Sequence, residues 1–249
     1  GLHIDALSRG RQCLVNMQTG AEAGIRLAST FTGVPNMLVE QFVLQHPELN
    51  VTEVGVDPDE VATLLLNDHV DFALTLSPIE TLELEQVAFV VEPMLLHLPD
   101  ALEPKEGPVR LADYQHERFA IFEGGKDSYA TILRCCNQAS FVPFIVYRCT
   151  RSQRVHELVN HLNACTLMPA HLALRNWRNL PEETRRHILL VDEPRCHRTI
   201  YLYRRRREDA PEGTMIFGAF AAQFFHNMNA EITTLLVRCY PAKHDIFLQ

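Results

Sequence analysis

Residues 57–76 read DPDEVATLLLNDHVDFALTL, and this stretch decides the fold class. Its first part predicts a helix, because Asp57 can cap, Pro58 fits the first helical position and Glu60 can reach back to the cap. Its last part, Val70–Leu76, is nearly all apolar and predicts a parallel strand that is covered on both faces. A helix followed directly by such a strand is typical of an α/β protein.

The same alternation of strands and helices continues on both sides of this stretch. Upstream, the pattern predicts a strand at 25–29, a helix at 34–45 and a strand at 51–56. Downstream, it predicts strands at 118–122, 144–148, 165–168, 188–191 and 199–203, and helices at 128–138, 155–162, 170–177 and 214–229. Two such runs imply two small α/β lobes with mostly parallel sheets.

The two predicted lobes are connected twice along the chain. We expect the joins at 92–108, which is rich in proline, and near 193–197. Two lobes joined by two crossings form a cleft, and clefts between domains are where small molecules bind. The pattern therefore predicts a two-lobed protein with a ligand site.

The composition is that of an ordinary globular protein and argues against nucleic-acid binding by this polypeptide. The chain has 249 residues, of which 47% are hydrophobic and 22% charged. Its net charge of −8 opposes phosphate binding. No apolar run approaches the roughly 20 residues that span a bilayer, and no signal peptide is evident at the start, which lacks a Met. The seven cysteines are scattered, so we expect a reducing, cytoplasmic location.

The first segment, residues 2–19, predicts a helix. Leu7, Leu14 and Ala21 lie at heptad spacing, which is typical of a short coiled-coil seam. The helix can pair with another copy or pack on its own domain, and the sequence leaves both open. The following glycines, Gly20 and Gly24, suit a hinge.

An ordered set of segments resembles the effector-binding region of LysR-type transcription regulators. Gly24–Ser29 is similar to the family's first strand, and Pro35, Leu38 and Phe42 with His46-Pro47 to its first helix and exit. The stretch LLLNDHVDFAL at 64–74 resembles the "L…G.LD.A" element, and similar matches occur at 92–96 and 111–114. The resemblance runs from about residue 2 to about residue 230. It departs at 163–169, where only the Pro of a Gly-rich turn is kept.

The resemblance implies an α/β fold of two Rossmann-like lobes with a hinge, similar to type 2 periplasmic binding proteins. The implied organisation is a linker or dimerisation helix at 1–22, lobe I at 24–95 with 198–230, lobe II at 96–197 and a C-terminal tail at 231–249. It also implies a homodimer or tetramer, a small-molecule effector and DNA binding through an upstream helix-turn-helix. No cofactor, no metal, no membrane partner and no enzymatic activity are expected.

The expected effector-binding residues follow the strands of both lobes, because the binding crevice lies at the carboxyl ends of parallel strands. Hydroxyl groups and N–H groups at a helix start suit a carboxylate or another anion. The first lobe contributes Ser29, Thr30, Phe31, Thr32, Thr75 and Ser77. The second lobe contributes Glu123, Gly124, Thr150, Arg151, Thr166 and Pro169.

Each of these assignments has a simpler structural alternative. Thr30 and Thr32 can cap the following helix. The residues after Thr75 can form an ordinary turn before Pro78, and glycines after 123 are also common in turns. Arg151 can be a solvated side chain, and we favour that reading over a clamp for an acidic effector.

Other chemistry has weaker support in the sequence. His156 and His161 lie off one helical face, and Cys196-His197 has no second pair at metal-ligand spacing. Cys149 and Cys165 end neighbouring predicted strands, so a redox sensor is a minor alternative. The run at 204–207, RRRR, is followed by Glu208-Asp209, so we expect a solvated face that neutralises itself.

Two other classes of protein share this expected scaffold. A solute-binding protein of a transporter has the same lobes, but the missing signal sequence and the cysteines argue against it. An enzyme would need a catalytic set, and the chain has no G-x-S-x-G, P-loop or G-x-G-x-x-G motif.

Overall fold

The computed structural model describes residues 24–122, 126–149, 155–177, 179–192, 196–207 and 209–239. The helix predicted at 2–19 lies outside these residues. The chain divides into two compact units, which we treat separately. Unit 1 comprises the residues up to Phe89 with Ile200–Phe225, and unit 2 comprises Val90–Thr199 with the residues from His226 onward. The boundaries between the units fall inside two strands and one helix.

Unit 1 is built on a sheet with the strand order β2, β1, β3, β9. These strands are β1 (Ile25–Ser29), β2 (Val51–Gly55), β3 (Phe72–Thr75) and β9 (His197–Arg205). β1 pairs in parallel with both β2 and β3, as the alternating pattern predicts. β9 pairs antiparallel with β3, so the sheet is mixed. All residues of β3 are buried, because helices cover both faces of the sheet.

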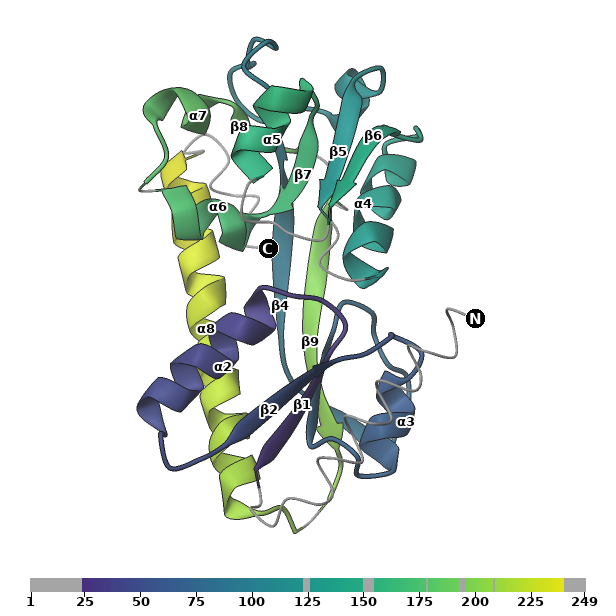
Figure 1. The fold of residues 1–249 in the computed structure, drawn as a ribbon, viewed down its shortest axis with the longest axis vertical. Coiled ribbons are helices and arrows are strands. Elements are labelled where there is room, and N and C mark those ends of the chain that lie inside the picture. The colour runs from purple at the N-terminus through teal and green to yellow at the C-terminus, as the bar shows by residue number, and fades with distance from the viewer. Residues whose placement is uncertain are drawn as a thin grey trace. The chain divides into compact units, whose positions relative to one another are not determined.

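The helices α2 (Val34–Gln45) and α3 (Val61–Leu66) lie on opposite faces of this sheet (Figure 1). On the α2 face, Phe217 packs its ring 4.9 Å from that of Phe42 and 5.0 Å from that of Phe72. Phe217 belongs to α8 (Glu212–Cys239), which shares this face. On the other face, α3 packs on alternate strand residues such as Ala28 and Ala73. Because side chains alternate between the two faces of the sheet, unit 1 has one apolar layer under α2 and α8 and another under α3.

The local predictions in unit 1 are confirmed for β1 and α2 and differ at α3. The helix was expected to start at Pro58, but it begins at Val61 without a side-chain cap. The Asp57 N–H donates to the Glu60 carboxylate at 3.2 Å, and the Glu60 N–H donates to the Asp57 carbonyl at 3.0 Å. The first bond is the predicted reach of Glu60 back to Asp57, and together the two bonds close a turn at 57–60 ahead of the helix.

Unit 2 contains a group of antiparallel strands and a separate two-stranded parallel sheet. β4 (Leu84–His97) pairs antiparallel with β7 (Thr166–Pro169) and with β8 (Ile188–Leu190). β5 (Arg118–Phe122) and β6 (Phe144–Cys149) pair in parallel. The helices are α4 (Lys126–Gln138), α5 (Val155–Leu162), α6 (Ala170–Trp177) and α7 (Glu182–Arg186), with a 3₁₀ turn at Leu111–Tyr114.

Three features of the chain differ from the sequence expectations. β4 already begins at Leu84, so the join expected at 92–108 starts inside a strand. α7 was not predicted, because all of its residues are exposed or half-buried and it has no apolar period. The region expected as a tail from 231 continues α8 to Cys239, because Ile232, Leu235 and Leu236 extend its buried face.

None of the helices in the described ranges combines the length and apolar character that crossing a bilayer requires.

Candidate functional site

The carboxyl ends of β1 and β3 bring several predicted residues together in unit 1. Ser29 pairs with Leu74 in the parallel register, and the Thr30 N–H donates to the Leu74 carbonyl at 3.0 Å. Thr75 is the next residue of β3. Ser29, Thr30 and Thr75 are all buried, which is unusual for hydroxyl side chains at strand ends. The sheet therefore gathers three of the predicted residues at one edge.

The hydroxyls of Ser29 and Thr75 lie on opposite sides of this sheet. Ser29 shares its side with Leu27 and Leu74, because alternate residues of a strand face the same way. Thr75 follows Leu74 and so faces the α3 side. A molecule can contact both hydroxyls only if it lies across the edge of the sheet, where the two faces meet.

Glu53 is a partner at this edge that the sequence analysis missed. The Ser29 hydroxyl donates to the Glu53 carboxylate, with Oγ 2.6 Å from Oε1. Glu53 lies in β2 directly beside Leu27 of β1. The sequence gives one indication of this role, which is that Glu53 is a charged residue within a short, otherwise uncharged strand. The Ser29 proton is thus engaged by Glu53.

Thr75 takes part in a local turn. Its Oγ1 accepts from the Ser77 N–H at 3.1 Å and lies 3.3 Å from the Ser77 carbonyl, to which it can donate. The turn before Pro78, considered as the simpler alternative, is therefore present. Ser77 itself is exposed.

The start of α2 is not capped by a threonine. Its N-cap is Gly33, at φ 98°, and no side chain bonds to the helix start. The alternative role of Thr30 and Thr32 as caps is therefore wrong, because a glycine with positive φ turns the chain instead. Thr32 is exposed, whereas Phe31 is 2% exposed and packs in the core of unit 1.

In unit 2 the structure describes two of the predicted residues. Thr166 begins β7 opposite His97, and Pro169 ends β7 opposite Met94. The residue before Thr166 bridges in parallel to Phe119, near the start of β5. Only Pro169 therefore lies at a carboxyl strand end, while Thr166 is fully buried within the unit. Glu123, Gly124, Thr150 and Arg151 lie outside the described residues.

A buried charged cluster in unit 2 is the second feature that the sequence analysis missed. The Glu92 carboxylate contacts His171 through Oε1, 2.7 Å from the ring Nδ1, and accepts from Arg198 Nε at 2.8 Å through Oε2. Glu92 is 0% exposed and its two partners are 4% exposed. The His171 N–H, at the start of α6, also donates to Glu92. These residues are 79 and 106 positions away from Glu92 in the chain, so no spacing could reveal them.

The electrostatics of this cluster keep Glu92 ionised. Burial by itself raises the pKa of Glu92, but the charges of Arg198 and His171 and the hydrogen bonds from His171 lower it to about 2. Because a carboxylate only accepts, we assign the proton on the near side of the imidazole to Nδ1. His171 Nε2 is then buried without a hydrogen-bond partner among the described residues.

Four of the cysteines have described side chains. Cys135, Cys136, Cys165 and Cys196 are buried and form no disulfide. Burial raises the pKa of Cys165 to about 12, which suppresses its thiolate. Cys165 lies at the level of Phe119 and Cys149 at the level of Phe122, about 10 Å apart along the strands. Within the described ranges, no group of three metal-ligating side chains occurs either.

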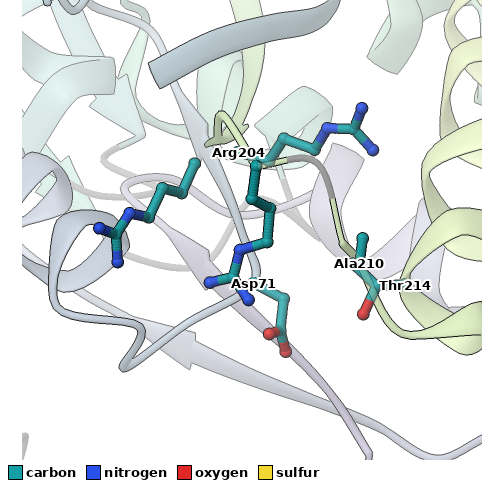
Figure 2. Close-up of a pocket in the computed structure, with 6 residues that line it drawn as sticks. Asp71, Arg204, Ala210 and Thr214 are labelled. Atoms are coloured by element: carbon teal, nitrogen blue, oxygen red, sulfur yellow. The ribbon is translucent and has the colours of Figure 1, made fainter. Parts of the chain in front are cut away.

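The arginine run that ends β9 forms ion pairs with acidic residues from other parts of unit 1. Arg204 bonds to Glu85, while Arg205 and Arg207 both bond to Asp68. These partners are distant in sequence. Glu208 lies outside the described residues, so the expected neutralisation by Glu208-Asp209 stays a prediction. Figure 2 shows the six residues that line a pocket at this place, which are Asp71, Arg204, Arg205, Arg207, Ala210 and Thr214. It lies at the amino-terminal edge of β3, opposite to the edge that holds Thr75.

Comparison with known proteins gives the family. A model of the LysR substrate binding domain matches residues 22–225, so this chain belongs to that family. The fold is the type 2 periplasmic-binding-protein-like fold of that domain. LysR regulators are not enzymes; they bind small-molecule effectors and act as oligomers that bind DNA.

Solved structures with the same fold are distant in sequence. The regulatory domain of CcmR from Synechocystis PCC6803, in complex with 2-PG, is 16% identical, with a TM-score of 0.62 over 82% of this chain and 98% of that one. The effector binding domain of QuiR, in complex with shikimate, is 17% identical, with a TM-score of 0.57 over 83% and 99%. Full-length CbnR with its target DNA is 19% identical, with a TM-score of 0.61 over 89% and 77%.

Proposed function

We propose that this chain is the effector-sensing and oligomerisation domain of a LysR-type transcription regulator, and that it binds a small anionic molecule at the carboxyl edge of unit 1. The observation that carries the proposal is the convergence of Thr30 and Thr75 at the ends of adjacent parallel strands, in a chain of this family. Such strand ends are where ligands bind in open α/β sheets.

The residues at this edge have distinct proposed roles. The Thr30 hydroxyl contacts the effector directly, because it lies in the turn between β1 and α2. Ser29 and Glu53 act as a fixed pair that orients the edge and accepts a hydroxyl or ammonium group of the effector. Pro169, Glu123, Gly124, Thr150 and Arg151 remain predictions for the contacts from the second lobe.

The solved relatives support a small effector that carries oxygen atoms. CcmR was solved with 2-PG and QuiR with shikimate, both in domains of the same fold. For this chain to act as a switch, the effector must bind one conformational or oligomeric state more tightly than the other. A shift from mostly inactive to mostly active needs on the order of 5 kcal/mol of differential binding.

The test begins with a thermal-shift screen of shikimate, small hydroxy acids, amino acids and aromatic carboxylates. A compound that binds only the folded state raises the midpoint, and the stabilisation grows with the logarithm of its concentration over its dissociation constant. Calorimetry of the best compound then compares Thr30→Val with Thr52→Val, the same change at an exposed position of β2. We expect weaker binding in Thr30→Val alone. Equal affinity in both variants would remove Thr30 from the site.

The alternative of a transport solute-binding protein is less well supported. Both classes share the two-unit scaffold, so the fold alone does not separate them. The family model that matches residues 22–225 is that of the regulators. Binding of the full-length protein to its operator DNA, altered by the effector, is the outcome that only a regulator gives.

A further inference from the structure

The first turn of α6 in unit 2 meets a carboxylate from another part of the chain. α6 follows β7 directly, so its start lies at the carboxyl end of that strand. Helix starts suit anions, because their first N–H groups have no partner within the helix and carry partial positive charge. Here the His171 N–H donates to the Glu92 carboxylate of β4. We propose that Glu92 is an internal anion that fills an anion site at the start of α6 and so excludes external anions from it.

Three donors from two elements surround this carboxylate. Glu92 Oε1 accepts from the His171 backbone N–H and lies 2.7 Å from His171 Nδ1, while Oε2 accepts from Arg198 Nε at 2.8 Å. A helix N–H, an imidazole and a guanidinium are groups that bind carboxylate and phosphate ligands in proteins. The cluster therefore has the donors of a ligand site, and a side chain of the same protein takes the place of the ligand.

The carboxylate is enclosed together with its partners. Glu92 is fully buried, and His171 and Arg198 are nearly so. Although burial raises the pKa of Glu92, the charges of Arg198 and His171 lower it to about 2, so the group is an anion throughout the neutral range. An external anion that displaced Glu92 would leave its charge buried and unpaired, which is strongly unfavourable. The site is therefore occupied whenever this part of unit 2 is folded.

The first helix of unit 1 begins differently. α2 follows β1, and no side chain bonds to its start at Gly33. Of these two helix starts, the one in unit 1 is therefore the one that can meet an acidic ligand, while a ligand group at the end of β7 carries no negative charge. This consequence for the ligand rests on the proposed function, whereas the filled site in unit 2 does not.

An emptied anion site should accept an external anion of the same shape. Glu92→Ala removes the side chain beyond Cβ, and the atoms removed correspond to one acetate ion. The experiment is thermal unfolding of this variant, as the whole chain, in sodium acetate and in sodium chloride at the same ionic strength. Acetamide, which resembles acetate in shape but has no charge, is added to the chloride buffer in a third series. We expect acetate to raise the midpoint by roughly 2–4 °C at about five times its dissociation constant, and acetamide to leave it unchanged.

Two variants on the same strand serve as controls. Glu92→Gln keeps the volume of the side chain, so acetate has no space to enter, and Glu85→Ala breaks a half-exposed pair with Arg204. In these variants and in the wild type, the midpoints in acetate and chloride should agree. A purely structural ion pair would make Glu92→Ala less stable without any response to acetate. Equal midpoints of Glu92→Ala in acetate and chloride would therefore overturn the proposal, as would an equal rise with acetamide or an equal acetate response in Glu85→Ala.

A refolding measurement keeps the test decisive if Glu92→Ala does not fold in chloride buffer. Circular dichroism after dilution from urea then compares the folded fraction in acetate with that in chloride. We expect recovery in acetate alone, and no recovery in acetate would count against the filled site. The result is independent of the effector screen, because a screen of the wild type without any stabilising compound would contradict the proposed function and leave the acetate response of Glu92→Ala unchanged.

Discussion

Arg198 Nε lies 2.8 Å from Glu92 Oε2, and both side chains are buried within unit 2. The pair joins β4 to β9, and through His171 it also holds the start of α6. Removing two charges from water is expensive, so a buried ion pair adds little stability compared with apolar residues of the same volume. Breaking it by removing one partner is a different matter, because the other charge stays buried and uncompensated.

We therefore expect Glu92→Gln to lower the free energy of unfolding by about 3–5 kcal/mol, because Arg198 loses its counter-charge. Urea denaturation followed by circular dichroism measures this change. The matched control is Glu85→Gln, since Glu85 is 28% exposed and pairs with the half-exposed Arg204. Its loss should cost about 1 kcal/mol or less. Similar losses in the two variants would show that the Glu92 cluster does not behave as a buried charge network.

The same carboxyl group predicts an acid dependence. The pKa of Glu92 is lowered from 4.5 to about 2 in the folded protein, so its ionisation stabilises the fold above 4.5. This contribution, about 3 kcal/mol, is lost as the pH falls from 4.5 through 2. The difference in unfolding free energy between the wild type and Glu92→Gln should stay constant from neutral pH to about 5 and shrink below that. A difference that does not change with pH would contradict the low pKa.

Removing the Tyr114 hydroxyl should not lower the free energy of unfolding, in contrast to removing the Glu92 carboxylate. Its hydroxyl is buried without a hydrogen-bond partner among the described residues, and burial raises its pKa. An unsatisfied buried hydroxyl costs about 1–3 kcal/mol, so Tyr114→Phe should be neutral or stabilising. The control is Tyr203→Phe, because the Tyr203 oxygen accepts from the Ile79 N–H at 3.2 Å and its loss should destabilise by about 1 kcal/mol. Thermal unfolding compares the two, and a clearly destabilised Tyr114→Phe would rule out the unsatisfied hydroxyl.

Gly33 should resist substitution. It caps α2 at φ 98°, where a side chain is strained, so we expect Gly33→Ala to cost about 1–3 kcal/mol. Gly55 ends β2 with no heavy atom within 4 Å of the position of an added Cβ. Gly55→Ala should therefore be neutral or stabilise by up to about 1 kcal/mol. Equal midpoints for the two variants in urea would indicate that the turn at Gly33 accepts other backbone angles.

Cys165 should be inert toward thiol reagents in the folded protein. Burial raises its pKa to about 12, so at pH 8 almost none of it is thiolate. Alkylation followed by peptide mass spectrometry should leave Cys165 unlabelled in buffer and label it in denaturant. Rapid labelling of the native protein would contradict this environment.

The parts of this fold that could be predicted are those with a local cause. β1, α2, α5 and α6 lie at their predicted bounds, because strand and helix periods and a first-turn proline are read from neighbouring residues. The later start of α3 depends on a pair of hydrogen bonds that close its turn. α7 has no buried face and so no period to detect.

In the candidate site, too, only the features with a local cause could be predicted. The sequence placed Thr30 and Thr75 at strand ends, and the parallel register joins them at one edge. It could not show that Ser29 is bonded to Glu53, that Thr166 is enclosed or that Gly33 replaces a threonine cap. These three features depend on contacts with neighbouring strands and turns, which the sequence pattern does not reveal.

The amino-acid sequence alone determined the α/β class, the order of most elements and the family resemblance, because these follow from short-range periodicity and from motifs in order along the chain. Only the tertiary structure decided that β9 pairs antiparallel, that the arginines of 204–207 find Glu85 and Asp68, and that Glu92 meets His171 and Arg198. Pairings of charges and strands over long separations are set by the packing of the whole chain, so they leave no local pattern to read.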